Sequence, residues 1–451
     1  MADKRDLKVK QHKHTDKKRD PSPMAWERTQ QKRSPRAKET AATTDTGEVS
    51  ETTAVSRERK RKAARRRLIR RMVILFVVVV LGLTIWNNWD SLQPRQLMFW
   101  MEQTFSTSGE GYPVEIAGNS VLDMQQAQGY LVVLTDTSVV AFNANGGEVM
   151  RRQHNYTNPM LMCDGRYLLV AEIGGKRFRL ETMPETVLDV TADNLAADKK
   201  TAILDTAIEN PLISADVLDD GTVALVTSSS GSYTSEILVY TPSGKLKYRQ
   251  RYVSMQAVDI ALSPDEEDVA VIGVEADKGI MKSILRIHSL KSEETTPRME
   301  YTGTDVMLGR VTYLDDDQIA AIGDTQTWVV NADGDLNERL SYDRQLVGYA
   351  IGEKAIGLAL QKYGASDGGE LMVVNGEGKT AYTSAFAGDF RHVTMNDDGV
   401  LLLTSGQLYW GTYEQMSGNT MAQQDGRMVG RVSDKAVVLG LTALTEYSLT
   451  E

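Results

Sequence analysis

Few residues in this 451-residue chain have the types and spacing that support chemistry. The C-terminal part holds three histidines far apart in sequence, His154, His288 and His392, and the chain has one cysteine, Cys163. A zinc site needs Cys or His ligands at short, regular spacing, and a disulfide needs a second cysteine. The pattern therefore predicts no metal site. Cys163 ends an apolar run before a turn, and we expect it to be a buried small apolar residue.

One segment, Asn331–Asn337, looks like a calcium-binding loop. With Gly334 at the sixth position of such a loop, Val329 and Leu340 occupy the first and twelfth positions, where carboxylates are required. The segment is therefore predicted to be a hairpin turn. No paired nucleophile and base and no phosphate-binding loop occur in the sequence, so no catalytic residue and no cofactor are expected, and an enzymatic function is the less favoured prediction.

Carboxylates gather instead in short turns that precede apolar runs. If these turns share one face of the fold, they form an acidic surface that attracts cations or a basic partner. The alternative is that Asp is frequent there because its side chain hydrogen-bonds the backbone of its own turn. The candidate residues of this acidic face are Asp219, Asp220, Asp265, Asp268, Asp315, Asp316 and Asp397.

Eight apolar runs recur with starts 36 to 55 residues apart, which indicates a repeat protein. Uninterrupted apolar runs of this length suit strands that are buried on both faces. The runs are residues 130–135, 167–171, 222–227, 269–274, 319–323, 355–360, 400–404 and 436–441.

A second kind of turn follows several runs and contains an apolar residue, three turn residues and Gly, as in Phe142–Gly146 and Val374–Gly378. Each unit then reads as four strands in about 45 residues, the size of a propeller blade. The sequence predicts an all-β fold, an eight-bladed β-propeller over residues 111–451, or a seven-bladed one if two runs share a blade. The last unit lacks a fourth strand, and we expect Tyr112–Ala117 to supply it beside Ala443–Leu449.

In such a blade the first and third turns emerge on one face, which is the predicted acidic face. Longer connections at residues 228–235, 275–280 and 361–369 are expected on the opposite face, where function usually lies. Candidate interaction residues there are Tyr233, Tyr363 and Lys278. The three histidines are expected in three different blades, on outer strands or connections.

Residues 72–89 carry no charge, and a helix of this length covers roughly 27 Å at about 1.5 Å per residue, enough to cross a bilayer. Trp86 and Trp89 lie at its C-terminal end. A polybasic segment, residues 57–71, lies at its N-terminal end and includes Arg65, Arg66, Arg67, Arg70 and Arg71. This asymmetry predicts a single-pass plasma-membrane protein with a cytoplasmic N terminus and an extracellular C-terminal domain. A cleaved signal peptide is the alternative, but it would have a shorter apolar core nearer the N terminus.

Charge is distributed unevenly along the chain, with a net +13 over residues 1–71 and −23 over residues 72–451. Residues 1–56 have no apolar period and are predicted to be a disordered cytoplasmic tail. The basic segment would contact anionic lipid at the cytoplasmic face. Nucleic acid is a less favoured partner. Residues 90–110 are expected to form a stalk between the helix and the propeller.

The sequence resembles an uncharacterised family of single-pass membrane proteins from Gram-positive bacteria, a domain of unknown function with a β-propeller-like body. The stretches that carry the resemblance are the basic flank with the apolar helix, Gly109–Val114, Leu134–Thr137, Gly174–Leu180 and Asp219–Val226. The resemblance covers residues 57–451 and implies the architecture, with no established activity. The Gly turns are also similar to those of quinone-dependent dehydrogenase propellers, but this body offers only Trp328 and Trp410 for the stacked Trp residues of those enzymes.

We therefore expect a membrane-anchored extracytoplasmic propeller that binds another protein or an envelope component. The alternative is a cell-envelope hydrolase or lyase whose carboxylates converge in the central channel.

Overall fold

The computed structural model describes residues 111–116, 120–183, 202–229, 231–291, 296–315, 318–331, 336–364, 367–396 and 399–449. The chain divides into two compact units, residues 1–87 and 88–451, and all described residues belong to the second. The predicted tail, polybasic segment, membrane helix and stalk lie outside the described residues. In the part of the chain that is described, no helix is long and apolar enough to cross a membrane.

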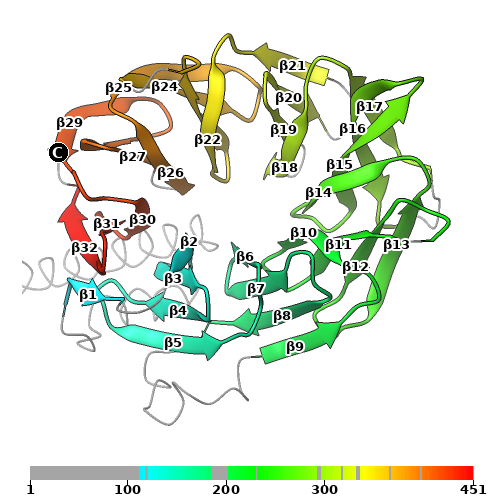
Figure 1. Cartoon of the computed structure of the whole chain (residues 1–451), viewed down its shortest axis with the longest axis horizontal. Coiled ribbons are helices and arrows are strands. Elements are labelled where there is room, and N and C mark those ends of the chain that lie inside the picture. The colour runs from blue at the N-terminus through cyan, green and yellow to red at the C-terminus, as the bar shows by residue number, and fades with distance from the viewer. Residues whose placement is uncertain are drawn as a thin grey trace, which may run out of the picture. The chain divides into compact units, whose positions relative to one another are not determined.

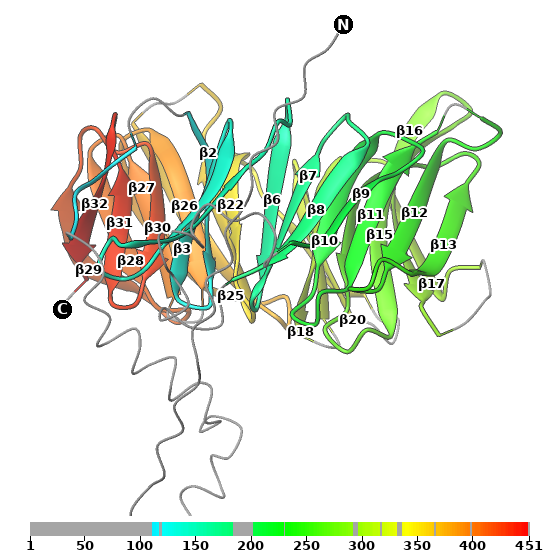
Figure 2. The ribbon, with the colours of Figure 1, turned by 90° about the horizontal axis from the view of Figure 1, so that it is seen from below.

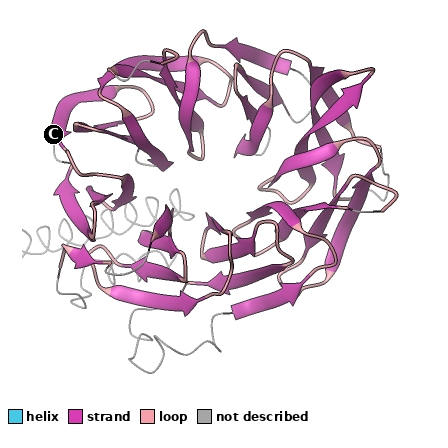
Figure 3. Ribbon diagram, viewed as in Figure 1, coloured by secondary structure: helices cyan, strands magenta, loops and turns pink. Residues whose placement is uncertain are grey.

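Eight sheets of four antiparallel strands are arranged around a central axis, so the prediction of an eight-bladed β-propeller is confirmed (Figures 1 and 3). Figure 2 shows the same ring from the side, with the strands running from one face to the other. The first strand of each blade lies next to the axis and is called the inner strand. The inner strands are β2 (Val121–Ala127), β6 (Pro159–Asp164), β10 (Leu212–Val217), β14 (Gln256–Leu262), β18 (Leu308–Asp315), β22 (Gln345–Ile351), β26 (Phe390–Asn396) and β30 (Met428–Val432).

The eight apolar runs form the second strands, as their uniform apolar character predicts. All six residues of β3 and of β27 are buried. The second strands are β3 (Tyr130–Thr135), β7 (Tyr167–Glu172), β11 (Val223–Ser228), β15 (Asp268–Asp277), β19 (Gln318–Gly323), β23 (Ala355–Gln361), β27 (Gly399–Thr404) and β31 (Lys435–Leu439).

Among the described residues, the predicted Gly turns join the third and fourth strands in the first, third and sixth blades. Gly146 and Gly378 have φ values of +72° and +79°, a region that residues with a Cβ rarely adopt. The third strands are β4 (Ser138–Phe142), β8 (Arg177–Thr182), β12 (Ser235–Tyr240), β16 (Ile280–Ser289), β20 (Gln326–Asn331), β24 (Gly368–Asn375), β28 (Gln407–Gly411) and β32 (Ala443–Ser448). The fourth, or outer, strands are β5 (Glu148–Gln153), β9 (Ala202–Ala207), β13 (Leu246–Tyr252), β17 (Met299–Gly303), β21 (Leu336–Ser341), β25 (Thr380–Ala387), β29 (Met416–Ala422) and β1 (Val114–Glu115).

The ring is closed in the eighth blade by strands from both ends of the described chain. Strand β1 pairs with β32 through Val114 opposite Leu444 and Glu115 opposite Ala443. The predicted pairing of these two segments is therefore confirmed. Closure leaves no blade with an unfilled outer position.

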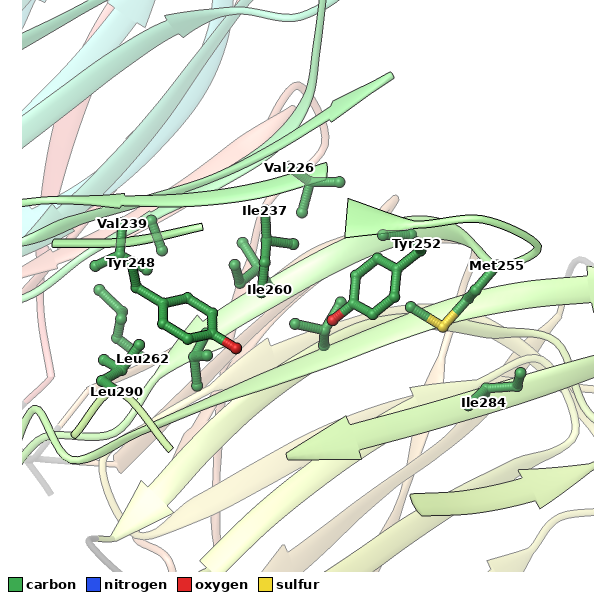
Figure 4. Close-up of a cluster of buried hydrophobic side chains, with 14 of the residues drawn as sticks. Val226, Ile237, Val239, Tyr248, Tyr252, Met255, Ile260, Leu262, Ile284 and Leu290 are labelled. Carbon is green, nitrogen blue, oxygen red and sulfur yellow. The ribbon is translucent and has the colours of Figure 1, made fainter. Parts of the chain in front are cut away.

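Apolar side chains fill the space between neighbouring blades. The third and fourth blades enclose one such cluster, in which Tyr248 and Tyr252 lie among Ile237, Ile260 and Ile284 (Figure 4). The cluster holds blades together because each sheet is apolar on both faces. Cys163, on β6, packs against the cluster between the first two blades and is partly buried, whereas the sequence predicts a buried residue.

Candidate functional site

A β-bulge recurs in the inner strands of six of the eight described blades. The register shifts near the start of each of these strands, directly before one residue. Bulges redirect the side chains of the strand at the point where they occur. The residues that follow the bulges are Asp123, Ser214, Asp259, Arg310, Gly348 and His392.

Asp259 is the best connected of these residues and joins three blades. Its Oδ1 accepts hydrogen bonds from Ser214 Oγ of the third blade at 2.5 Å and from Arg310 Nη1 of the fifth blade at 3.3 Å. Its Oδ2 accepts the backbone N–H of Val311 at 2.8 Å. Both oxygens of this buried carboxylate are therefore bonded.

On inner strands β10 and β6, an Asp further along the strand also accepts a hydrogen bond from the next blade. Asp216 accepts the backbone N–H of Leu262 in the next blade at 2.8 Å. Asp164 is hydrogen-bonded by the backbone of Asp219, also in the next blade. His392 takes the same role between the seventh and eighth blades, where Nδ1 accepts the N–H of Val429 at 3.4 Å. Polar side chains of the inner strands thus join the second blade to the third, the third to the fourth, the fourth to the fifth and the seventh to the eighth.

Charge is divided across the axis of the ring. The first four inner strands each contribute one Asp, namely Asp123, Asp164, Asp216 and Asp259. The other four inner strands carry basic residues, and their one acidic residue is Asp315 at the end of β18. The basic residues are Arg310, Arg391, His392 and Arg431.

Two contacts join inner strands of blades that are not neighbours in the ring. Arg310 Nη2 of the fifth blade lies 3.7 Å from Sδ of Met162 in the second blade. Asn396 of the seventh blade donates from Nδ2 to Oε1 of Gln126 in the first blade at 2.6 Å. Tyr349 on β22, in the sixth blade, is 42% exposed. Solvent therefore reaches the surface that the inner strands form around the axis, which we call the inner wall. We call Asp123, Asp216, Asp259, Arg310, Tyr349 and His392 the axis cluster.

Burial raises the pKa of three inner-strand carboxyls, those of Asp164, Asp216 and Asp259. Burial and the neighbouring Asp219 and Asp216 raise the pKa of Asp164 to about 7. Burial also raises the pKa of Asp216 to about 6, although Arg310 opposes the shift. The pKa of Asp259 is raised by burial too, against the effect of Arg310. These groups bind protons more tightly than ordinary carboxyls because charge is costly away from water.

The chemistry open to this cluster is limited by its bonding. A general base or nucleophile needs a lone pair directed at a substrate. Asp259 uses both oxygens on protein partners, Asp216 uses Oδ2 on the next blade, and Arg310 is directed to Asp259 and Met162. The hydrogen bonds of the axis cluster therefore favour a structural role, in which these side chains join the blades, over a catalytic role.

The histidines do not assemble into a metal site. His154 interacts through Nε2 with the carbonyl of Thr135 at 3.1 Å and stacks on Tyr156. His288 is buried and its Nε2 lies 2.8 Å from the hydroxyl of Tyr252. Across the described residues, no group of three or more His, Cys, Asp or Glu side chains could hold a metal ion. The expected outer location of His392 is wrong, because it follows the bulge of inner strand β26.

The two faces of the ring differ in the connections that form them. The turn face carries the turns between first and second strands and between third and fourth strands, and the loop face carries all other connections. The predicted acidic residues Asp219, Asp220, Asp265 and Asp268 lie on the turn face. Asp315 ends β18 at the same face, while Asp316 and Asp397 lie outside the described residues.

Several acidic side chains on the turn face are bonded to groups within the propeller. Asp220 accepts the N–H of Thr222 at 2.7 Å, and Asp265 accepts the N–H of Glu267 at 3.0 Å. Asp268 is buried and pairs with Arg298 at 2.9 Å. These contacts favour the interpretation of the acidic residues as turn residues over an open acidic surface.

The candidate interaction residues lie on the loop face, at the predicted connections. Tyr363 is 92% exposed in the connection between β23 and β24, and Lys278 lies exposed at the tip of the β15–β16 hairpin. Tyr233 is only partly exposed, because Arg251 lies over its ring and Asn210 donates to its hydroxyl at 3.2 Å. The basic residues Arg65, Arg66, Arg67, Arg70 and Arg71 lie outside the described residues.

Exposed apolar side chains gather on the loop face. Of nine large exposed apolar residues in the described chain, six lie in or at the ends of its connections. These six are Val253, Ile280, Met281, Met307, Tyr363 and Leu441.

The β15–β16 hairpin extends this apolar surface beyond the sheet. Its pairs Glu275–Lys282, Ala276–Met281 and Asp277–Ile280 lie past the last residues paired with the neighbouring strands β14 and β17. Val253 and Met307 lie in the connections on either side of the hairpin.

Sequence reasoning located the loop face but missed the axis cluster. The signal was one Asp in each of the first four inner strands, and comparison of those strands would have shown it.

Comparison with solved structures supports the fold. The C-terminal WD40 domain of Sif2 matches with a TM-score of 0.50 and 10% identity, covering 76% of this chain and 99% of that one. The Neurospora crassa Pan2 WD40 domain matches with a TM-score of 0.41 and 12% identity, covering 65% and 91% of the two chains. A variant of KlHsv2 with loop 6CD replaced by a Gly-Ser linker matches with a TM-score of 0.34 and 14% identity, covering 49% and 71%. At these identities the similarity concerns the fold alone.

A search of curated proteins gives no match. The family of unknown function DUF5711 matches residues 103–423, which include the first seven blades, and the chain belongs to this family.

Proposed function

We propose that this protein is a membrane-anchored scaffold whose extracytoplasmic propeller binds a protein or envelope component through the loop face. The observation that carries the proposal is the gathering of exposed apolar side chains on that face, while the polar groups of the inner wall are bonded to one another. Exposed apolar groups that cluster on one face of a rigid scaffold commonly mark a binding surface.

The anchoring rests on the sequence. The apolar segment 72–89, the basic flank with Arg65 to Arg67, Arg70 and Arg71, and the resemblance to Gram-positive membrane proteins support a plasma-membrane location with the propeller outside. Domain boundaries at residues 56, 71, 89 and 110 are part of this proposal. Anionic lipid at the cytoplasmic face would contact the basic flank.

Cysteine labelling in intact cells tests the topology. Tyr363→Cys places a thiol at a position that is 92% exposed, and we expect an impermeant maleimide to label it without lysis. Ser34→Cys in the tail should react only after lysis. The unmodified chain is the control, because its Cys163 lies on inner strand β6 and packs against apolar core. Labelling of Ser34→Cys in intact cells would overturn the orientation.

Crosslinking and affinity capture of the full chain in its native membrane test the binding role. We expect one or more partners to be captured, and to be lost when Ile280, Met281 and Met307 of the loop face are all changed to Ser. Leu246→Ser is the matched control, because Leu246 is an exposed apolar residue at the turn face. Equal capture by both variants, or loss in both, would contradict binding through the loop face.

A cell-envelope hydrolase or lyase is the second candidate. It is favoured by the convergence of Asp164, Asp216 and Asp259 on the inner wall, where burial raises their pKa values. It predicts release of soluble fragments from isolated cell-wall polymers by the full chain, and loss of that release in Asp164→Asn. No fragment release above that of Asp164→Asn would exclude it.

A further inference from the structure

The exposed apolar side chains of the loop face are concentrated around one hairpin. Four of the six lie on the β15–β16 hairpin or in the connections on either side of it: Val253, Ile280, Met281 and Met307, which are 76%, 60%, 48% and 48% exposed. We call these four residues the hairpin patch. The other two, Tyr363 and Leu441, belong to the sixth and eighth blades. The part of the loop face over the third to fifth blades therefore presents most of its exposed large apolar side chains.

The hairpin holds its apolar tip in a fixed position. A two-residue turn, Lys278–Gly279, joins the strands, and both residues have a positive φ, +49° and +83°, as tight hairpins require. Lys282 Nζ lies 3.6 Å from Oε2 of Glu275, its cross-strand partner. The side chain of Ser254, which follows Val253 in the preceding connection, hydrogen-bonds Glu275 as well. The tip is thus braced although it extends beyond the neighbouring strands.

Hydrogen bonds also fix the connections on either side of the hairpin. The N–H of Met307 donates to Oδ1 of Asp324 at 2.8 Å, and the carbonyl of Met307 accepts the N–H of Asp324 at 3.2 Å. In the other connection, the carbonyl of Val253 accepts a hydrogen bond from the hydroxyl of Thr234 at 2.6 Å. Side chains on backbone that is already ordered lose little further freedom when they bind, so the hairpin patch is preorganised for a partner.

The charged groups around the hairpin patch are mainly acidic. The end of the hairpin, residues 275–282, and the connections at residues 304–307 and 324–325 contain four acids and two bases, a net charge of −2. The acids are Glu275, Asp277, Asp305 and Asp324, and the bases are Lys278 and Lys282. Glu275 is paired with Lys282, whereas Asp277, Asp305 and Asp324 are exposed. Charge complementarity therefore favours a partner that carries cations around the apolar contact.

The same charges argue against other occupants. An acidic surface repels anionic lipid and anionic wall polymers. Arg251 and Arg286, on strands of the same blades, are already paired with Glu236 and Glu300. A neutral sugar chain also fits poorly, because its hydroxyl groups would lose hydrogen bonds to water against aliphatic side chains. A protein surface supplies both apolar side chains and cations.

We propose that the hairpin patch is the binding site for a protein that presents apolar side chains surrounded by Lys or Arg, with Asp277, Asp305 and Asp324 facing those cations. The inference rests on the proposed function, and it adds the class of partner and the part of the loop face that the partner covers. The apolar contact supplies most of the affinity, while the surrounding charges make the binding sensitive to salt.

Photocrosslinking of the full chain in its native membrane tests the site and the class of partner. The photoreactive residue p-benzoylphenylalanine replaces Met281 in one variant and, in separate variants, Tyr363 or Leu441 elsewhere on the loop face. We expect the variant at Met281 to give an adduct that is digested by protease but not by muramidase, and that organic solvent does not extract. Mass spectrometry should find Lys or Arg in the crosslinked peptide of the partner.

Neutralising the acids tests the charge of the partner. In the Met281 crosslinking variant, Asp277→Asn with Asp305→Asn should lower the adduct yield about two- to tenfold at low salt, and the difference should disappear in about 0.5 M NaCl. Asp389→Asn with Asp425→Asn is the matched control, because both residues are exposed in loop-face connections of other blades. The control makes the same change in net charge and should leave the yield unchanged.

The outcomes separate this inference from the proposed function. A lipid or wall-polymer adduct at Met281, or equal yields from the two double Asn variants, would overturn the class of partner. Adducts at Tyr363 or Leu441 without one at Met281 would overturn the location and leave binding through the loop face intact. Adducts at none of the three positions would overturn the proposed function as well.

Discussion

The side chain of Arg310 in the fifth blade reaches the side chain of Met162 in the second, with 3.7 Å between Nη2 and Sδ. The same guanidinium donates from Nη1 to Oδ1 of Asp259 in the fourth blade at 3.3 Å. One cation therefore links three blades at the axis.

Removal of Arg310 should leave two buried carboxyls without their cation. Asp259 and Asp216 both interact with Arg310, and each has a pKa raised by burial. We expect Arg310→Ala to lower the free energy of unfolding by about 3–5 kcal/mol, measured by urea denaturation at pH 7.5. Arg391 is exposed on inner strand β26 of the seventh blade, and Arg391→Ala should change the free energy of unfolding by no more than about 0.5 kcal/mol. Equal effects of the two changes would contradict a specific role for Arg310.

Stability should depend on pH through Asp216 and Asp164, whose pKa values are about 6 and about 7. Both values lie above those of the unfolded chain, so the folded state binds more protons between about pH 4 and 7. These two groups therefore stabilise the fold as the pH falls toward 5 and destabilise it as the pH rises toward 8.

His288 has the opposite effect, since burial lowers its pKa to about 4 and the unfolded chain binds its proton first. The measurement that isolates Asp216 is the difference in unfolding free energy between the wild type and Asp216→Asn at pH 5.5 and pH 8. We expect Asn to be relatively more favourable at pH 8. A difference that does not change with pH would show that Asp216 titrates normally.

Tyr252 and His288 form a buried polar contact within the apolar cluster of Figure 4, with 2.8 Å between the hydroxyl and Nε2. Within the described structure, Nδ1 of His288 has no hydrogen-bond partner. Tyr252→Phe removes the remaining bond and should cost about 1–3 kcal/mol in thermal or urea unfolding. Tyr363→Phe, which changes a fully hydrated hydroxyl, should have no measurable effect. A neutral result for Tyr252→Phe would mean that the contact contributes nothing net to stability.

Gly378 shows what the repeated Gly turns require. Its φ is +79°, and a Cβ at this position would lie 2.9 Å from Cβ of Glu338 in the preceding blade. We expect Gly378→Ala to lower the unfolding free energy by about 1–3 kcal/mol. Gly364 has a similar φ of +73°, and a Cβ added there would have no atom within 4 Å. Gly364→Ala should therefore lower the unfolding free energy by less, through backbone strain alone. A cost for Gly364→Ala as large as that for Gly378→Ala would leave no role for contact between blades.

The blade architecture could be predicted from the sequence because it depends on short-range patterns. The second strands are buried on both faces over most of their length and are therefore rich in apolar residues, as in Tyr130–Thr135. The short turns between third and fourth strands in the first, third and sixth blades contain a Gly at positive φ, as at Gly146. The incomplete last unit, ending at Leu449, required a strand from the other end of the domain, and Val114–Glu115 supplies it.

The contacts among the polar side chains of the inner wall depend on the tertiary structure. Asp259 and Arg310 are 51 positions apart, and Arg310 and Met162 are 148 positions apart, so no local pattern joins them. The bulges that aim these side chains, and His392 with them, add one residue that strand periodicity does not reveal. The sequence determined which strands form a blade, because burial and turn geometry act within some 45 residues. Closure of the ring determined which polar groups meet, because only then do distant inner strands face one another.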